Sequence, residues 1–317
     1  MKPHLRKDVF SSAWVILSDE RGRRPNDYLN PDTRCPFCYG NESDTPPSVF
    51  ERKKDGKWYI RVVRNKYPAL VDVRRDSLIK EEIFRKHFFS GVHEIIIETP
   101  EHDKKIHEIE HLDEILEVFA GRMRKLYSKK GIKYVMLFRN YGKNAGATLR
   151  HPHSQIIALP LVPTRILEEK KSFLEYYDRK KRCLMCDVIE SEIKIKKRVF
   201  YINDSFIAFA PFASRFNFEI WISPLKHIPD YYNEKNFDLL CDVIRKVFSA
   251  LHNSIAEVSY NIIFHTSPHN FRDFHWHMEI LPKLAMPAGF EWGSGFYINS
   301  ISPEKAVSIL VSGKKFI

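Results

Sequence analysis

The spacing of hydrophobic residues predicts the main elements of this chain. Between residues 110 and 130, apolar side chains recur three or four positions apart, which places them on one face of a helix. They are Leu112, Ile115, Leu116, Phe119, Met123 and Leu126. A second helix is predicted near residues 234–252, and a charged helix near 165–182. Apolar runs at residues 134–139 and 260–265 predict strands.

These elements belong to an internal repeat. Each half opens with a C-x-x-C pair and continues to a β-rich run in which a glutamate precedes a histidine by eight positions. The pairs are Glu94 with His102 and Glu219 with His227. A helix, a strand and an H-x-H strand that runs into Leu-Pro follow in each half. This order predicts an α+β fold with largely antiparallel sheets and flanking helices. We expect two tandem halves, residues 1–164 and 165–317.

Composition and charge narrow the class of protein. In 317 residues, 44% hydrophobic and 13% aromatic content can supply a packed core. No apolar run approaches the ~20 residues of a membrane helix, and the first eight residues lack the apolar segment of a secretory signal. We therefore expect a soluble cytoplasmic protein with no membrane partner.

The net charge of +11 has two interpretations. Basic residues are spread along the chain in pairs such as Arg23-Arg24 and Lys53-Lys54, as on the solvated surface of a heat-adapted protein. The alternative is attraction for anions, either nucleic acid or a phosphorylated small molecule. There is no arginine-rich tail or recognition-helix pattern, so we favour small phosphorylated ligands and expect no nucleic-acid partner.

Four of the five cysteines form the two C-x-x-C pairs, which predict metal sites. Tetrahedral zinc accepts two thiolates and two imidazoles. The first predicted set of ligands is Cys35, Cys38, His102 and His151, and the repeat gives the second set as Cys183, Cys186, His227 and His275. Four protein ligands leave no open position, so we expect two structural Zn²⁺ ions per chain. The sequence leaves His277 open as a fifth or alternative ligand of the second site. Cys241 lies in a helical pattern, as a buried apolar residue does.

The segment HPHSQ at residues 151–155 carries the strongest chemical signal. On a strand, positions 151, 153 and 155 share one face and would aim two histidines and an amide at the same point. A nitrogen nucleophile beside a neutral hydrogen-bonding group suits covalent phosphoryl-type transfer. The alternative is a strand with two surface histidines. The Gly- and Asn-rich residues 140–148 before it offer backbone N–H groups for an anion, which favours the functional interpretation.

Taken together, these residues resemble the galactose-1-phosphate uridylyltransferase family of the histidine-triad superfamily. The resemblance covers nearly the whole chain. It includes the Arg-rich residues 21–25, the first cysteine pair, residues 65–70, HPHSQ and the tail 289–291. It implies two histidine-triad-like halves and a ping-pong nucleotidyltransferase. Triad hydrolases usually carry a third histidine where this chain has Gln155.

The resemblance also implies roles for individual residues. His153 would attack the α-phosphorus of a nucleotide sugar and form a nucleotidyl-histidine, and Gln155 would hydrogen-bond a phosphoryl oxygen. Substrate contacts would come from Arg21, Arg24, Asn65, Asn140, Thr148, Phe290 and Glu291. In dimers of the family the tail reaches the neighbouring subunit's site, so we expect a homodimer.

Two departures from the family's usual sequence leave the identity of the substrate open. The second C-x-x-C pair and a tail without the usual glutamine resemble the ADP-glucose phosphorylase branch. The first hypothesis is a UDP-glucose–hexose-1-phosphate uridylyltransferase, which uses UDP-glucose or UDP-galactose and a sugar 1-phosphate. The second is an ADP-glucose phosphorylase with inorganic phosphate as acceptor. A zinc-knuckle nucleic-acid-binding protein is a remote third hypothesis, because it gives HPHSQ no role.

Overall fold

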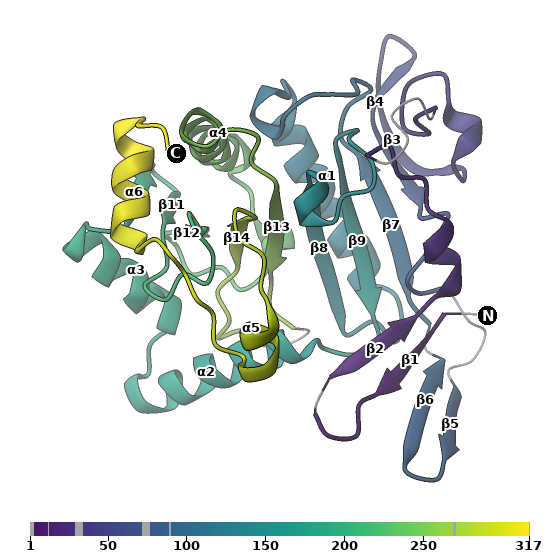
Figure 1. Ribbon diagram of the computed structural model, residues 1–317. Coiled ribbons are helices and arrows are strands. Elements are labelled where there is room, and N and C mark those ends of the chain that lie inside the picture. The colour runs from purple at the N-terminus through teal and green to yellow at the C-terminus, as the bar shows by residue number, and fades with distance from the viewer. Residues whose placement is uncertain are drawn as a thin grey trace. The chain divides into compact units, whose positions relative to one another are not determined.

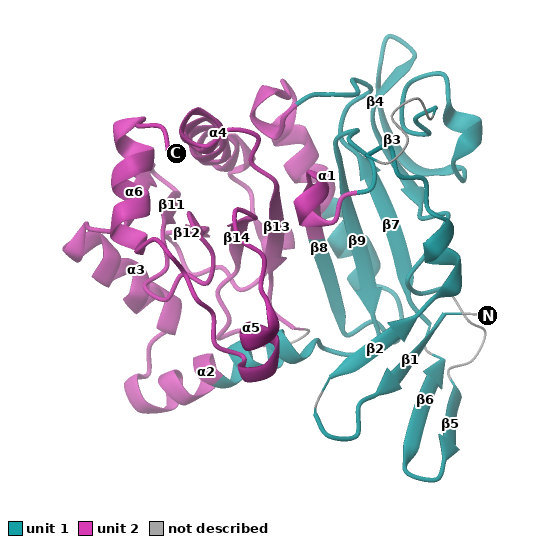
Figure 2. Ribbon diagram, viewed as in Figure 1, with its two compact units in different colours: residues 1–104, 121–137, 148–171 teal, residues 105–120, 138–147, 172–317 magenta. Residues whose placement is uncertain are grey.

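Helices and antiparallel strands make up the protein, which confirms the predicted α+β class (Figure 1). The computed structural model describes residues 3–11, 13–28, 34–71, 77–88, 90–268 and 271–316. The chain forms two compact units (Figure 2). The first contains residues 1–104, 121–137 and 148–171, and the second contains residues 105–120, 138–147 and 172–317. The predicted division into tandem halves at residue 164 stays a prediction.

The first unit carries the HPHSQ segment on an antiparallel sheet. The strand order β9-β7-β4-β3 places β9 beside β7 and β7 beside β4. These strands are β3 (Ser48–Lys54), β4 (Lys57–Arg64), β7 (Val92–Ile97) and β9 (His153–Leu159). All six residues of β7 are buried, because the strand lies between two others and is covered on both faces. Two short 3-10 helices, Asp19–Arg23 and Glu42–Asp44, also belong to the first unit.

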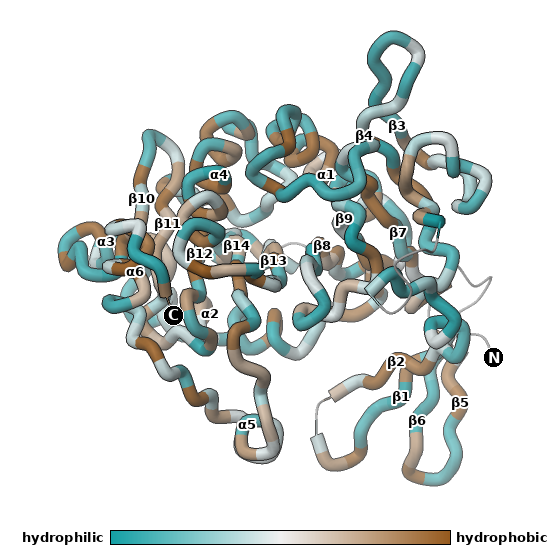
Figure 3. Tube along the Cα trace, turned by 45° about the horizontal axis from the view of Figure 1, so that its top comes forward, coloured by the Kyte–Doolittle hydropathy of each residue, from teal (hydrophilic) through white to brown (hydrophobic). Residues whose placement is uncertain are grey.

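A smaller sheet of order β2-β1-β6-β5 also belongs to the first unit. Its strands are β1 (His4–Lys7), β2 (Trp14–Leu17), β5 (Ser77–Glu81) and β6 (Phe84–Phe88). The hydrophobic residues of β2 are brown in Figure 3, and Val15 and Ile16 on it are exposed. The hydrophobic spacing did not predict this sheet, because its strands are short, are mostly exposed and do not alternate cleanly.

In the second unit, antiparallel strands follow the order β10-β11-β12-β14-β13. Its strands are β10 (Val199–Ile202), β11 (Phe206–Phe209), β12 (Ile220–Pro224), β13 (Tyr260–His265) and β14 (His277–Pro282). Its helices are α3 (Leu184–Ile195), α4 (Phe237–Ser254), α5 (Gly289–Ser294) and α6 (Pro303–Ser312). Its 3-10 helices are Ile106–Glu108, Lys143–Ala145 and Tyr231–Asn233. The helix predicted near residues 234–252 is α4, and the strand predicted at residues 260–265 is β13.

Three elements contribute residues to both units. They are α1 (Leu112–Tyr127), β8 (Tyr134–Tyr141) and α2 (Thr164–Lys180). Each confirms a predicted element, with boundaries shifted by at most three residues. The apolar side chains that predicted α1 are all buried.

Each unit packs a hydrophobic cluster around its cysteine pair. In the first unit, Cys35 packs with Phe37, Trp58 and Ile97. In the second, Cys183 packs against a cluster that includes Met185. The two C-x-x-C pairs thus lie at the edge of packed apolar side chains, which restrict how far the thiols can move. Cys241 is buried on α4, as predicted, and its Sγ also accepts a hydrogen bond from Nε of Arg245 at 3.2 Å.

Candidate active site and metal-ligand groups

The HPHSQ segment divides at the start of β9. The strand begins at His153, and His151 lies in the bend before it. The prediction that residues 151, 153 and 155 share one strand face is therefore wrong for His151. His153 and Gln155 do share a face, because they pair with Ile97 and Ile95 of β7 at alternate positions. The side chains of His151 and His153 therefore belong to two different sites.

His153 and Gln155 line a cleft of about 220 Å³ in the first unit. Its floor includes a row of three residues across neighbouring strands, because Val63 pairs with Ile95 and Ile95 pairs with Gln155. The other predicted substrate contacts that line the cleft are Arg24, Asn65 and Thr148. Five of the predicted site residues, from Arg24 to Gln155, therefore meet at one concave surface.

The cleft is predominantly basic. Besides Arg24, the side chains of Arg34, Arg64 and Lys66 line it, against one acidic residue, Asp44. Arg34 and Asp44 form an ion pair of 3.1 Å. Arg64 pairs with the buried Glu94 at 3.5 Å, which leaves Arg24 and Lys66 to favour an anionic ligand such as a phosphate ester.

The hydrogen bond of His153 determines which ring nitrogen is reactive. Its Nδ1 atom lies 2.8 Å from the main-chain carbonyl oxygen of His151. A carbonyl oxygen can only accept, so Nδ1 carries the hydrogen and the Nε2 atom of the neutral ring holds the lone pair. The ring of Phe37 contacts the His153 ring edge to face, with centroids 5.3 Å apart. This contact and the Nδ1–H bond hold the imidazole in one orientation.

The side chain of His151 belongs to the first predicted metal site. Its Nδ1 atom lies 3.7 Å from the Sγ atom of Cys35 and 3.6 Å from that of Cys38, and Nδ1 of His102 lies 3.3 Å from Cys38 Sγ. The Nε2–H group of His151 donates to the carbonyl oxygen of Thr99 at 2.8 Å, which leaves Nδ1 as an electron-pair donor. Burial lowers the pKa of His151 to about 4, so the ring is neutral at pH 7.

The second predicted set repeats this arrangement. Nδ1 of His275 lies 3.5 Å from Sγ of Cys186 and 3.8 Å from Sγ of Cys183, and Nδ1 of His227 lies 3.9 Å from Cys186 Sγ. The Nε2 atoms of both histidines face carbonyl oxygens at 3.0 Å, those of Pro224 and Arg272. The group does not include His277, whose Nδ1 lies 3.3 Å from the carbonyl oxygen of His275.

Both groups fit a tetrahedral cation with two sulfur and two nitrogen ligands. In each, the four candidate ligand atoms lie within 4.8 Å of one another. Zn–S and Zn–N bonds at the tetrahedral angle place S and N about 3.6 Å apart, close to the observed separations. Burial raises the pKa of the Cys35 thiol to about 12, and a bound cation would favour the thiolate instead. The two groups are thus chemically suited to hold zinc.

Four predicted substrate contacts do not line the cleft. Arg21 lies beside it and donates from Nη1 to the carbonyl oxygen of Tyr67 at 3.0 Å. Asn140 belongs to the second unit, where its Oδ1 accepts from Asn261 at 2.8 Å. Phe290 and Glu291 lie on the exposed helix α5 of the same unit, and Glu291 accepts from the backbone of Ala288. Their roles stay predictions.

Sequence reasoning missed residues that the fold brings to this site. Arg64 and Lys66 line the cleft, and Phe37 packs against His153. His93 of β7 was also missed, although its Nε2 lies 3.0 Å from the Oε1 atom of Gln155. Phe37 lies inside the first C-x-x-C pair, which was a signal for it. The contact of His93 depends on strand pairing, so no short motif could reveal it.

The described residues include no helix that is both long enough and apolar enough to cross a membrane. This agrees with the absence of a long apolar run in the sequence.

Comparison with known proteins identifies relatives that match almost the whole chain. Residues 48–314 match the family described as "Domain of unknown function (DUF4921)". The ADP-glucose phosphorylase of Arabidopsis thaliana is 31% identical over 97% of this chain and 92% of that protein. The galactose-1-phosphate uridylyltransferase of Thermotoga maritima is 30% identical over 95% of this chain and 96% of that protein.

Solved structures show the same relationship. A structure of a uridylyltransferase has a TM-score of 0.85 and 27% identity, over 98% of both chains. The crystal structure of the Arabidopsis thaliana ADP-glucose phosphorylase with bound ADP-glucose has a TM-score of 0.76 and 30% identity, over 98% of this chain and 99% of that one. The similarity therefore extends across both units, and the chain belongs to the galactose-1-phosphate uridylyltransferase and ADP-glucose phosphorylase family of nucleotidyltransferase enzymes.

Proposed function

We propose that the protein transfers a nucleoside monophosphate in two steps through His153. The Nε2 lone pair attacks the α-phosphorus of a nucleotide sugar, and the P–O bond to the β-phosphate breaks, which releases a sugar 1-phosphate. An acceptor oxygen then attacks the same phosphorus, and the P–N bond returns its electron pair to Nε2. The supporting observation is the His153 Nδ1–H bond to the His151 carbonyl, which leaves Nε2 as the nucleophile in a basic cleft.

The other cleft residues would stabilise the transferred group. The Gln155 amide is suited to donate to a phosphoryl oxygen, and Arg24, with Arg21 behind it, would balance the phosphate charge. Asn65 and Thr148 offer polar groups to the nucleotide. Glutamine cannot take up a proton and therefore does not activate water, which protects the intermediate until the acceptor arrives.

The proposed substrates are UDP-glucose and a hexose 1-phosphate such as galactose 1-phosphate. The uridylyltransferase of Thermotoga maritima, which resembles this chain over almost its full length, supports this choice. A second candidate is phosphorolysis of ADP-glucose with inorganic phosphate as acceptor. The comparable identity to the plant phosphorylase and the second cysteine–histidine group support that candidate.

Zn²⁺ is the cation that we propose for both cysteine–histidine groups. The ligands would be Cys35, Cys38, His102 and His151 in one group, and Cys183, Cys186, His227 and His275 in the other. A bound ion would fix the loops that carry these residues, a structural role. In the first unit it would fix His151, whose carbonyl oxygen orients the nucleophile.

We also propose that the protein is a homodimer in which the α5 tail completes a site. Phe290 and Trp292 are exposed on this short helix, as expected of residues that contact a ligand or a second subunit. Asn140 would contact the nucleotide. Light scattering tests the dimer, and a monomer at assay concentration would contradict it.

A matrix of donors and acceptors tests the proposed function. UDP-glucose and ADP-glucose, each labelled at the α-phosphate, are combined with galactose 1-phosphate, glucose 1-phosphate or inorganic phosphate. We expect label on the protein that is acid-labile and base-stable, as for a phosphoramidate, and its transfer to a sugar phosphate. Transfer only from ADP-glucose to phosphate would select the second candidate. Unlabelled protein with every donor would contradict the mechanism.

A further inference from the structure

His93 lies directly behind Gln155 and does not line the cleft. It is 2% exposed and is the second residue of the buried strand β7. Because Gln155 pairs with Ile95 and Ile157 pairs with His93, the side chains of His93 and Gln155 are diagonal neighbours on one face of the sheet. A buried imidazole at this place requires hydrogen-bond partners, and it has them on both ring nitrogens.

The backbone determines the tautomer of His93. The N–H group of Ala69 donates to Nδ1 of His93 at 3.0 Å. An atom that accepts from an amide cannot carry a hydrogen, so the hydrogen of the neutral ring is on Nε2. That Nε2–H group lies 3.0 Å from Oε1 of Gln155 and donates to it. Burial lowers the pKa of His93 to about 3, with Arg21 and Arg24 adding to the effect, so the ring stays neutral.

This hydrogen bond fixes which end of the Gln155 amide is free. With Oε1 engaged by His93, the NH₂ group of Gln155 is the end left for a ligand in the cleft. The opposite orientation would place two donors, Nε2–H and NH₂, against each other and present a carbonyl oxygen to the ligand. A phosphoryl oxygen requires a donor, so only one of the two orientations is productive.

The side-chain amide of Asn65 is oriented in the same sense, with its oxygen engaged by the protein. Its Oδ1 accepts from the N–H of Tyr67 at 2.8 Å, so its NH₂ group faces away from that turn. The Nδ2 atom lies 3.1 Å from Nε2 of His93, so with Nε2 protonated two donors approach each other there. The contacts with Ala69 and Gln155, one on each ring nitrogen, outweigh this single unfavourable approach.

We propose that His93 is a positioning residue that holds Gln155 with its amide NH₂ group toward the transferred phosphoryl group. This inference rests on the proposed function of the cleft. His93 touches neither substrate nor phosphorus and acts through Gln155. The Nε2–H group of His93 donates to Oε1 of Gln155. This contact leaves the NH₂ group of Gln155 as the donor at the cleft surface.

Two substitutions separate this role from a purely structural one. In H93N, the Asn oxygen replaces Nδ1 as the acceptor for Ala69 but leaves no donor at the position of Nε2. In H93Q, the longer amide places an NH₂ group near Gln155 but removes the acceptor for Ala69. A donor lost from a transition-state site costs on the order of 100-fold in kcat. We expect H93N to lose up to about that factor in kcat, with little change in KM for the nucleotide sugar, and H93Q to retain most of the activity.

The opposite ranking would overturn the proposal, because it would mean that His93 serves only to hold Ala69. Equal activity of both variants and wild type would overturn it as well. If both variants lose activity, H93N is compared in the Q155A background. No further loss there supports action through Gln155, and an independent loss contradicts it.

A measurement without turnover distinguishes failure of this inference from failure of the proposed function. Nitrogen-15 NMR of histidine-labelled protein, with H93N identifying the signals, reports which ring nitrogen of His93 carries the hydrogen. We expect it on Nε2, and a protonated Nδ1 would overturn the inference. Wild-type protein that transfers no label but shows the Nε2–H tautomer would refute the proposed function alone.

Discussion

The Nδ1 atom of His153 donates to the carbonyl oxygen of His151, and the second unit repeats the contact between His277 and His275. The two contacts are 2.8 and 3.3 Å long. The surroundings differ, because His277 stacks on Trp221 with ring centroids 4.8 Å apart, whereas His153 borders the cleft. The repeat therefore provides two oriented imidazoles, of which we assign the nucleophile to the first.

Alanine substitution at His153 and at His277 should have different effects. H153A should abolish the labelled intermediate and lower transfer by roughly 10⁴-fold or more, because no other described residue that lines the cleft carries an imidazole. H277A, the repeat-equivalent control, should still acquire label per folded molecule. Labelling with α-³²P donors and circular dichroism measure both. Label on H153A protein would remove the assignment of the nucleophile.

Replacement of a single cysteine should lower the number of zinc ions that each chain binds. C38S should lower the bound zinc from about two ions to about one per chain, and C186S should do the same for the other group, since four ligands are needed to close a site. C241S is the matched control, because Cys241 is buried outside both groups. Plasma mass spectrometry of the purified proteins measures the content. Loss of zinc in C241S, or its retention in C38S, would contradict the ligand sets.

His93 should also make the fold sensitive to acid. Its pKa is about 3 in the folded protein and near the ordinary 6.5 in the unfolded chain. Below pH 6.5 the unfolded chain therefore binds a proton that the native state does not, and the free energy of unfolding falls with falling pH. Between pH 7 and pH 5 this group accounts for about 2 kcal/mol of lost stability.

The H93Q variant isolates this contribution, because glutamine does not titrate. Its free energy of unfolding should decrease less than that of wild type over the same pH interval, by about 2 kcal/mol in urea titrations. Equal decreases in both proteins would mean that His93 is protonated in the native state at pH 5.

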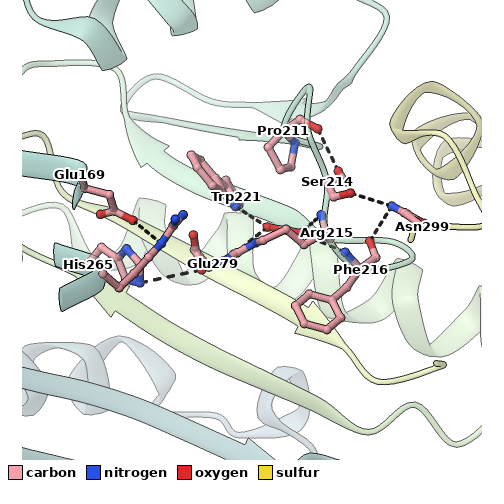
Figure 4. A network of polar contacts seen from close by, with 11 residues as sticks. Glu169, Pro211, Ser214, Arg215, Phe216, Trp221, His265, Glu279 and Asn299 are labelled. Carbon is pink, nitrogen blue, oxygen red and sulfur yellow. Dashed lines mark hydrogen bonds and ion pairs between the residues drawn. The ribbon is translucent and has the colours of Figure 1, made fainter. Parts of the chain in front are cut away.

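A buried ion-pair network in the second unit provides a stability test (Figure 4). Arg215 contacts Glu219 at 3.0 Å and Glu279 at 2.6 Å, and both carboxylates are almost fully buried. Burial would raise the pKa of Glu279, but the charges of His265 and Arg215 outweigh it and hold the pKa below its usual value. R215M leaves both carboxylates without this cation and should cost about 3–5 kcal/mol.

The matched control is Arg182, which pairs with Asp187 and Glu190 at the surface. R182M should change the free energy of unfolding by less than about 1 kcal/mol. Chemical denaturation measures both variants. A similar, small effect of R215M would show that water reaches the network.

Short sequence patterns predicted the helices, the strands and the two metal-ligand groups more completely than the residues that line the cleft. Helical spacing located α1 and α4, because their buried faces follow one period over many turns. The repeat brought together four-residue sets that span more than 90 positions, because each half has the same order of elements. His93 could not be predicted, since its contact depends on the register between β7 and β9. His151 was placed on the wrong face, because the chain bends at His151 and the strand begins only at His153.

The backbone of His151 links two parts of the molecule that have separate chemistry. Its ring faces two thiols, and its carbonyl oxygen holds the nucleophile two residues later. Inhibition by a chelator should therefore be expected here without any Lewis-acid role for the ion. Activity lost in EDTA and regained with zinc would report the alignment of one imidazole, not a metal that polarises the substrate.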